Sequence, residues 1–348
     1  MAKKFALVGG TADVLNVFDG DTGTQLSSNP LPEYLGSDYS VDMSYDGNIV
    51  AVTAWVKNYV WFKNLSTGAE TQVSCVGFVN AGRGFDGAGA FYVGGNGQYL
   101  RILAPYGAST TVATSAPVTV FPNQVPELSA CRVRNPDTGE QSLYTFNLVT
   151  GVIGDTFGFD VDGSVLASVD TTCTHILTSM PTGYGIRIWD YATLEFNDYV
   201  GPASGAGTTQ TRRGVAFTSD GAEFVIKTRD NYLGIGTFGG LGIRSMVLDA
   251  VLDYSADNAY TVVEGMLDDT HVLLSSLAIQ NMLVSFNLIT GAVDWENSNG
   301  HSLGSSTQDG RYVGVQPTTG PGATPPDPPT PPAEGVFWTG MVQCIEVV

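Results

Sequence analysis

The sequence predicts an all-β propeller, and two repeated phrases together with abundant glycine predict it. The first phrase is an apolar strand followed by a polar turn that ends in Thr-Gly. It occurs at residues 14–23, 60–68, 143–151 and 283–291, with weaker copies at 100–107, 186–193 and 233–240. Self-similarity at roughly 40 to 50 residues is typical of a radial β array in which each repeat is one blade. The 43 glycines fit many short strands joined by tight turns.

The second phrase is an Asp-Gly turn followed by a short apolar strand. It occurs at residues 46–47, 86–87, 162–163, 220–221 and 309–310. Asp-Gly between apolar runs indicates a hairpin, because glycine tolerates the positive φ that primed turns require. We expect each repeat to run inner strand, Asp-Gly turn, second strand, third strand, Thr-Gly turn and outer strand, which makes one four-stranded blade.

The number of blades follows from the spacing of the third strands, which we expect to begin near residues 13, 58, 98, 141, 184, 231, 281 and 336. Residues 5–26 lack an inner strand of their own, so strands from the C-terminal part should complete that blade and close the ring. Seven inner-strand candidates predict seven blades, and the eight third strands keep eight blades as the alternative. The whole chain, 1–348, is then one domain.

These repeats resemble the YVTN and WD40-like family of β-propellers. The resemblance is carried by residues 91–102, by residues 5–23, and by the Ser-Asp-Gly step at 219–221. Only Ile188-Trp189-Asp190 is similar to the WD40 signature, and the Gly-His dipeptide that belongs to that signature is missing. The resemblance implies a toroid with loops on two faces and no particular activity, because one fold hosts many functions.

Composition excludes several classes of partner. The net charge is −19, with no basic stripe, so neither nucleic acid nor an anionic membrane surface is an expected partner. No apolar run reaches the ~20 residues that cross a bilayer. The N-terminus reaches Asp13 too early for a secretory signal, so we expect assembly in a cytoplasm. Only 14% of residues are charged, and such a surface suits lasting contact with neighbouring subunits.

Residues 317–334 are rich in proline and interrupt the last blade before residues 336–338. Proline fixes φ and removes donors, which predicts an exposed insertion loop of polyproline II type. The alternative is an arm that docks on a neighbouring subunit or an SH3-type partner. The partner-binding candidates are then Pro325, Pro326, Pro328, Pro329, Pro331 and Pro332.

Metal and cofactor sites receive little support from the sequence. Asp19 with Asp21, and Asp160 with Asp162, pair carboxylates that Ca²⁺ favours, but both lack the rest of an EF-hand loop. Asx-stabilised turns are the preferred interpretation, with structural Ca²⁺ as the alternative and no cofactor predicted. The cysteines are spaced for neither zinc nor redox chemistry, so we expect small buried hydrophobes, with a long-range disulfide as the alternative: Cys75, Cys131, Cys173 and Cys344.

No catalytic constellation is evident. His175 and His271 lie in different repeats, and we expect His271 at a strand start. Residues 301–311 are similar to the H-x-x-x-x-S-x-D-G-R step of lactonase-type propellers, which implies a histidine, an acid and an arginine at the channel mouth. That resemblance makes His301 the candidate of an enzyme alternative. Tryptophans could stack on glycans, although strand patterns favour core packing for three of them: Trp61, Trp189 and Trp338.

The sequence therefore predicts a non-enzymatic structural or interaction propeller that joins other protein subunits in a larger assembly. A bacteriophage virion component, such as a capsid-decorating, collar or tail protein, fits the composition. Two alternatives remain open: a lactonase-like enzyme with His301 at the channel, and a cytosolic WD40-type scaffold.

Overall fold

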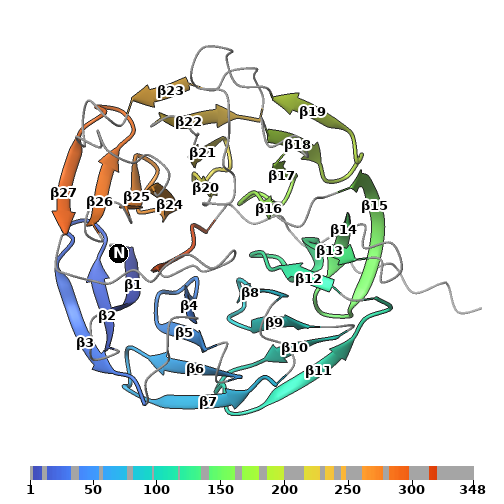
Figure 1. Cartoon of the computed structure of the whole chain (residues 1–348), viewed down its shortest axis with the longest axis horizontal. Helices are drawn as coiled ribbons and strands as arrows, with labels where there is room; N and C mark the ends of the chain where they lie inside the picture. The colour runs from blue at the N-terminus through green and yellow to red at the C-terminus, as the bar shows by residue number, and fades with distance from the viewer. Residues whose placement is uncertain are drawn as a thin grey trace, which may run out of the picture.

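The computed structural model describes residues 3–9, 14–32, 39–54, 58–76, 81–95, 98–116, 118–134, 141–160, 167–179, 186–199, 215–227, 232–238, 244–247, 261–276, 282–297 and 313–319. These residues form seven four-stranded antiparallel sheets, the blades, around one axis (Figure 1). The all-β propeller prediction is confirmed, with seven blades rather than eight.

The first four blades run as follows, each from the axis outward. Blade 1 contains β28 (Val313–Val315), β1 (Lys4–Gly9), β2 (Val14–Asp19) and β3 (Gln25–Pro30). Blade 2 contains β4 (Tyr39–Met43), β5 (Ile49–Ala54), β6 (Tyr59–Asn64) and β7 (Glu70–Ser74). Blade 3 contains β8 (Ala81–Phe85), β9 (Phe91–Gly95), β10 (Gln98–Ile102) and β11 (Ser109–Ala113). Blade 4 contains β12 (Val118–Phe121), β13 (Ser129–Arg134), β14 (Gln141–Asn147) and β15 (Val152–Asp160), with the short 3₁₀ helix η1 (Pro126–Leu128).

The remaining three blades follow the same order. Blade 5 contains β16 (Ala167–Val169), β17 (His175–Ser179), β18 (Ile186–Asp190) and β19 (Phe196–Tyr199). Blade 6 contains β20 (Val215–Phe217), β21 (Glu223–Lys227), β22 (Tyr232–Thr237) and β23 (Arg244–Val247). Blade 7 contains β24 (Thr261–Met266), β25 (His271–Ser276), β26 (Met282–Asn287) and β27 (Val293–Asn297).

Blade 1 closes the ring with strands from both ends of the chain. β28 pairs antiparallel with β1, and the register places Phe5 opposite Val315 and Leu7 opposite Val313. The N-terminal segment thus supplies the second, third and outer strands, and the C-terminal part supplies the innermost one. This confirms the predicted closure.

The Thr-Gly phrase is an Asx turn between the third and outer strands. In blade 1 the Oδ1 of Asp19 accepts hydrogen bonds from the amides of Asp21 and Thr22, both at 3.0 Å, and Gly23 follows with φ of 65°. The side chain satisfies turn amides that the sheet leaves free, and glycine accepts the left-handed φ. Asn64, Asn147 and Asn287 make the same pair of bonds in blades 2, 4 and 7.

Two Asp-Gly pairs do not precede second strands. The repeat predicts second strands at residues 165–168 and 311–315, after Asp-Gly at 162–163 and 309–310, but β16 and β28 are the innermost strands of blades 5 and 1. The turn after β16 begins at Asp170, and Cys173 adopts its positive φ of 60° without glycine. An Asp-Gly pair marks a tight turn without identifying which strands it joins, and this is the physical reason for the error.

The hydrophobic core lies between neighbouring blades. Phe62 of blade 2 meets Phe91 of blade 3 edge to face at 5.4 Å, and comparable apolar clusters fill the other blade junctions. Because neighbouring strands run antiparallel, the described first-to-second and third-to-outer turns emerge on one side of the ring. We call this side the turn face, and it carries the features discussed below.

Candidate functional site

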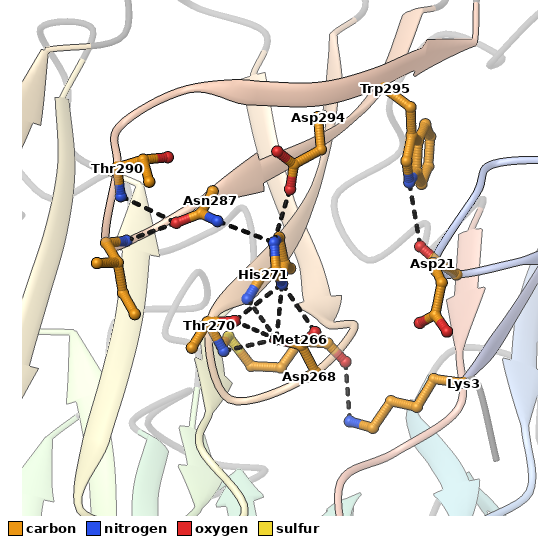
Figure 2. A network of polar contacts seen from close by, with 12 residues as sticks. Lys3, Asp21, Met266, Asp268, Thr270, His271, Asn287, Thr290, Asp294 and Trp295 are labelled. Atoms are coloured by element: carbon orange, nitrogen blue, oxygen red, sulfur yellow. Dashed lines mark hydrogen bonds and ion pairs between the residues drawn. The ribbon is translucent and has the colours of Figure 1, made fainter.

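A polar network lies on the turn face of blade 7 and reaches across to blade 1 (Figure 2). It contains Asp268 in the β24–β25 turn, His271 at the start of β25, Asn287 at the end of β26 and Asp294 on β27. We call these four residues the His271 relay. His271 begins its strand, as predicted.

Asp268 determines the tautomer of His271. The Nδ1 of His271 lies 2.7 Å from the Oδ2 and 2.9 Å from the Oδ1 of Asp268. The same carboxylate accepts the backbone amides of Thr270 at 2.6 Å and His271 at 2.8 Å. Partial burial opposes ionisation of Asp268, but these bonds outweigh it and hold its pKa below the ordinary value. An ionised carboxylate only accepts hydrogen bonds, so Nδ1 carries the proton.

The other ring nitrogen faces two competing partners. The Nε2 of His271 lies 2.6 Å from the Oδ2 of Asp294 and 3.0 Å from the Nδ2 of Asn287. The Oδ1 of Asn287 accepts the amides of residues 289 and 290, both at 2.9 Å, which fixes the amide with its donor end toward the ring. A donor from Asn287 favours a bare Nε2, whereas ionised Asp294 favours a protonated one. The two partners therefore place opposite demands on Nε2, which lies within hydrogen-bond distance of both.

A β-bulge places Asp294. On β27, Val293 pairs with Phe286 and Trp295 pairs with Ser285, which leaves Asp294 as the extra residue between them. Bulges re-aim a side chain and are common beside active sites. The side chains of Asp294 and His271 are 43% and 24% exposed, so solvent reaches this pair.

Blade 5 holds a partial copy of the same arrangement. His175 begins β17 and its Nδ1 lies 3.6 Å from the Oδ2 of Asp170. Its ring stacks on Phe238 at 4.5 Å. The β18–β19 pairing has no bulge, and Asn197 stands on the outer strand opposite Ile188. The second carboxylate therefore distinguishes the relay of blade 7.

Lys3 lies beside the relay and ties blade 1 to blade 7. Its Nζ donates to the carbonyl of Met266 at 2.8 Å and to the Oγ1 of Thr318 at 2.6 Å. Burial lowers the pKa of Lys3 to about 8, against the opposing effect of Asp269 and Asp268. An amine with this pKa is partly neutral near neutral pH, which exposed lysines are not.

Most of the site residues predicted from the sequence lie elsewhere. Asp19 and Asp21 lie in the β2–β3 turn, where Asp19 caps the turn as described above. Asp160 ends β15, and Asp162 lies outside the described residues. So do His301 and the six prolines proposed as partner contacts, Pro325, Pro326, Pro328, Pro329, Pro331 and Pro332. Among the residues that the structure describes, no three His, Cys, Asp or Glu side chains converge as a metal site requires.

Cysteine and tryptophan side chains serve packing in the described part of the ring. The thiols of Cys75, Cys131 and Cys173 are free and buried. Trp61 and Trp189 are buried, as their strand patterns indicate. Trp295 packs its ring against Phe5 at a centroid distance of 5.7 Å and donates its Nε1 to the carbonyl of Gly20 at 3.1 Å.

Sequence reasoning missed the His271 relay and Lys3. The available signal was the Asp-Asp-Thr-His run at 268–271, at a turn where the other repeats carry Asp-Gly. Asn287 belongs to the recognised Thr-Gly phrase. Asp294 could not be placed, because the bulge that aims it is a property of strand pairing.

Comparison with known proteins supports the fold without supplying a family. No protein-family model matches the sequence, and no curated protein matches it, so membership of the YVTN and WD40-like family is not confirmed. Among solved structures, apo AztD from Citrobacter koseri matches with a TM-score of 0.61, 11% identity and coverage of 85% of this chain and 95% of that one. Virginiamycin B lyase from Staphylococcus aureus matches with a TM-score of 0.54 and 12% identity, and the match covers 78% of this chain and 88% of that one.

The dihydro-heme d1 dehydrogenase NirN, in complex with DHE, matches with a TM-score of 0.57 and 13% identity. The match covers 85% of this chain and 63% of the NirN chain, so this protein spans less than two thirds of that relative. At this level of identity, the three likenesses show a shared fold.

The comparisons contradict the prediction of a non-enzymatic structural protein of a virion. The similar structures include a dehydrogenase and a lyase, and none of the three is named as a particle component. The step from a missing motif to a missing activity was wrong, because a propeller can bring polar groups together from separate turns and strands, as blade 7 does here. In the described part of the chain, no helix is both long and apolar enough to cross a membrane.

Proposed function

We propose that this chain is a β-propeller enzyme that uses the His271 relay for proton transfer in the cleavage of a lactone or related ester. The observation that carries the proposal is the placement of His271 Nε2 at 2.6 Å from the bulge-borne carboxylate of Asp294, with Nδ1 held by Asp268. A carboxylate, an oriented imidazole and an exposed proton-exchanging group are the parts that general acid–base catalysis requires.

The relay suggests a balanced sequence of proton transfers. Asp294 accepts a proton from a water molecule as the water oxygen forms a bond to the ester carbonyl carbon. The protonated Asp294 donates a hydrogen bond to the bare Nε2 of His271, whose Nδ1–H remains bonded to Asp268. The proton then returns through Asp294 to the leaving oxygen as the ester C–O bond breaks. The products are a free carboxyl group and a hydroxyl group, and the relay ends in its starting state.

Charge limits the substrate class. The chain carries a net charge of −19, and the relay contributes two carboxylates. A field of this sign repels anions and raises the local concentration of cations. A neutral or cationic lactone is therefore the preferred substrate over an anionic one.

The test is hydrolysis of a panel of neutral lactones and an activated aryl ester by the full chain. Asp294→Asn, which keeps the shape and removes the acid–base group, should lower kcat by about 10²-fold or more. His271→Gln should act alike, whereas His175→Gln in blade 5 is the matched control and should leave the rate unchanged.

Two outcomes would contradict this proposal. Hydrolysis at the rate of the blank by the native chain would remove the activity itself. Full activity in Asp294→Asn together with loss in His301→Ala would move the reaction to the other candidate histidine. Circular dichroism and melting of each variant separate loss of chemistry from loss of fold.

A further inference from the structure

An exposed isoleucine stands in a turn that is bonded to the His271 relay. Ile289 lies between β26 and β27, and 72% of its surface is exposed, the highest value among the large hydrophobic residues that the structure describes. A single exposed aliphatic side chain on a protein surface needs no explanation by itself. The position of this one, beside the only carboxylate–imidazole pair that the proposed function uses, gives it a use.

Hydrogen bonds fix the distance between Ile289 and the imidazole. The Oδ1 of Asn287 accepts the amide of Ile289 at 2.9 Å, and the Nδ2 of Asn287 lies 3.0 Å from the Nε2 of His271 (Figure 2). The amide of Leu288 donates to the carbonyl of Thr270, the residue before His271, at 2.8 Å. Since two hydrogen bonds and one side-chain amide join them, the nitrogen of Ile289 lies within about 8 Å of Nε2. A small molecule that contacts the imidazole is therefore within reach of Ile289.

The turn itself does not require a large aliphatic residue. In blades 1, 2, 4, 5 and 7 an Asx side chain accepts the amides of the residues two and three positions later. The residues that correspond to Ile289 are an exposed aspartate, serine and alanine and a half-buried valine: Asp21, Ser66, Ala192 and Val149. Hydrophobic stabilisation follows the apolar area removed from water, so an isoleucine that stays exposed adds little to folding. The stability of the turn thus does not account for Ile289.

The surroundings of Ile289 define the chemistry of a matching ligand. Asp268 and Asp294 form the polar side of the site, and Glu296, exposed on β27, adds a further acid. An anionic group is repelled here. An aliphatic chain gains by removing its own CH₂ groups and the side chain of Ile289 from water. The matching ligand has an uncharged polar head for the relay and an aliphatic chain for Ile289.

We propose that Ile289 is a specificity-determining residue of this site, and that the preferred substrate is a neutral lactone whose ring carries an aliphatic chain. The cleavage of that lactone rests on the proposed function, whereas the contact with Ile289 does not. Ile289 takes no part in proton transfer. It binds the chain equally in the ground state and in the transition state, so it should affect KM rather than kcat.

A series of lactones that share one ring tests the contact kinetically. γ-Butyrolactone has no chain, γ-octalactone has a butyl chain and γ-decalactone a hexyl chain. For the native chain kcat/KM should rise roughly twofold per methylene, because a half-open contact buries only part of each CH₂. Ile289→Ser, which installs the residue of blade 2, should raise KM for γ-decalactone about five- to tenfold with kcat unchanged. It should leave γ-butyrolactone unaffected, and Ile289→Leu should keep the native KM.

A second exposed aliphatic residue supplies the control. Val152 begins β15 in blade 4 and is 58% exposed, so Val152→Ser makes a comparable change far from the relay. It should leave the kinetics of all three lactones unchanged, and an equal rise in KM would overturn the proposal. The urea midpoint of Ile289→Ser should match the native one, because serine occupies the same turn position in blade 2.

Binding is measured separately from turnover. In Asp294→Asn, which lacks the proposed acid–base group, the methyl resonances of Ile289 are followed by NMR while a lactone is added. They are assigned by their absence from the spectrum of Ile289→Ser. They should shift with γ-decalactone and stay unchanged with γ-butyrolactone at the same concentration.

The two readouts distinguish failure of the inference from failure of the proposed function. Hydrolysis of all three lactones with equal kcat/KM, and no methyl shift, would overturn the role of Ile289 and leave the proposed function intact. No hydrolysis by the native chain, with a methyl shift confined to the lactones that carry a chain, would overturn the proposed function and support the contact. Absence of both hydrolysis and shift would overturn both.

Discussion

The buried amine of Lys3 makes the stability of the ring depend on pH in an unusual direction. Burial lowers the pKa of Lys3 from 10.5 in water to about 8 in the folded chain, while Asp269 and Asp268 act the other way. The unfolded chain therefore holds its proton to a higher pH than the folded chain. Between about pH 8 and pH 10.5 the unfolded state binds more protons, so stability rises with pH across this window.

The magnitude follows from the interval between the two pKa values. A pKa lowered by about 2.5 corresponds to about 3.4 kcal/mol once both states are deprotonated. At pH 10 an unfolded lysine is still mostly protonated, so the gain realised between pH 7 and pH 10 is about 2.5 kcal/mol. Other groups also titrate in this pH range. Their contribution to the free energy of unfolding cancels when the native chain is compared with a variant that differs only at Lys3.

The assay is urea unfolding of the native chain, Lys3→Met and Lys3→Arg at pH 7 and pH 10. Neither variant titrates in this range, because methionine is neutral and the guanidinium stays charged. The free energy of unfolding of the native chain should rise by about 2.5 kcal/mol relative to both variants. A relative change below about 0.5 kcal/mol would refute a lowered pKa for Lys3.

Three further outcomes check the packing. Gly23 has φ of 65°, and an added Cβ would lie 2.6 Å from the ring of Trp295, so Gly23→Ala should cost about 2 to 3 kcal/mol. Gly68 has φ of 75° in open space, so Gly68→Ala should cost about 1 kcal/mol, and equal losses in urea would contradict the contact. Asp86 is 1% exposed and accepts two amides and a hydroxyl, so Asp86→Ala should lower stability by about 3 kcal/mol, more than Asp46→Ala in the exposed counterpart turn. Burial raises the pKa of the described thiols, so a thiol reagent followed by peptide mapping should label them only after denaturation: Cys75, Cys131 and Cys173.

The fold was predictable because each blade repeats its local chemistry. The Asx residue, the threonine and the glycine of the third-to-outer turn are all visible in the sequence, and they fix where the third strand ends. Seven of the eight expected third-strand starts agree within two residues with β2, β6, β10, β14, β18, β22 and β26, and the eighth, near residue 336, lies outside the described residues. The first-to-second turns were harder to assign, because two of them lack the Asp-Gly pair. In blade 5 Cys173 takes the positive φ, and in blade 7 the turn is built on Asp268, which accepts the amide of Thr270.

The candidate site was not predictable, because it depends on register rather than on motif. His175 and His271 both begin a second strand after an aspartate-containing turn, and the sequence treats them alike. Only the strand pairing shows that β26–β27 contains a bulge whereas β18–β19 does not. A single inserted residue on an outer strand has no signature of its own when loop lengths vary among repeats.

The contrast between the two histidines also explains why blade 7 is the better candidate for chemistry. Both ring nitrogens of His271 meet carboxylates, whereas His175 has its one ion pair at 3.6 Å and covers its ring with Phe238. A bulge of the same kind leaves Leu26 unpaired on β3 of blade 1, so the bulge itself recurs in the fold. In blade 7 the bulge carries the carboxylate of Asp294 beside the Nε2 of His271. The proposed proton transfer therefore rests on this carboxylate and not on the bulge.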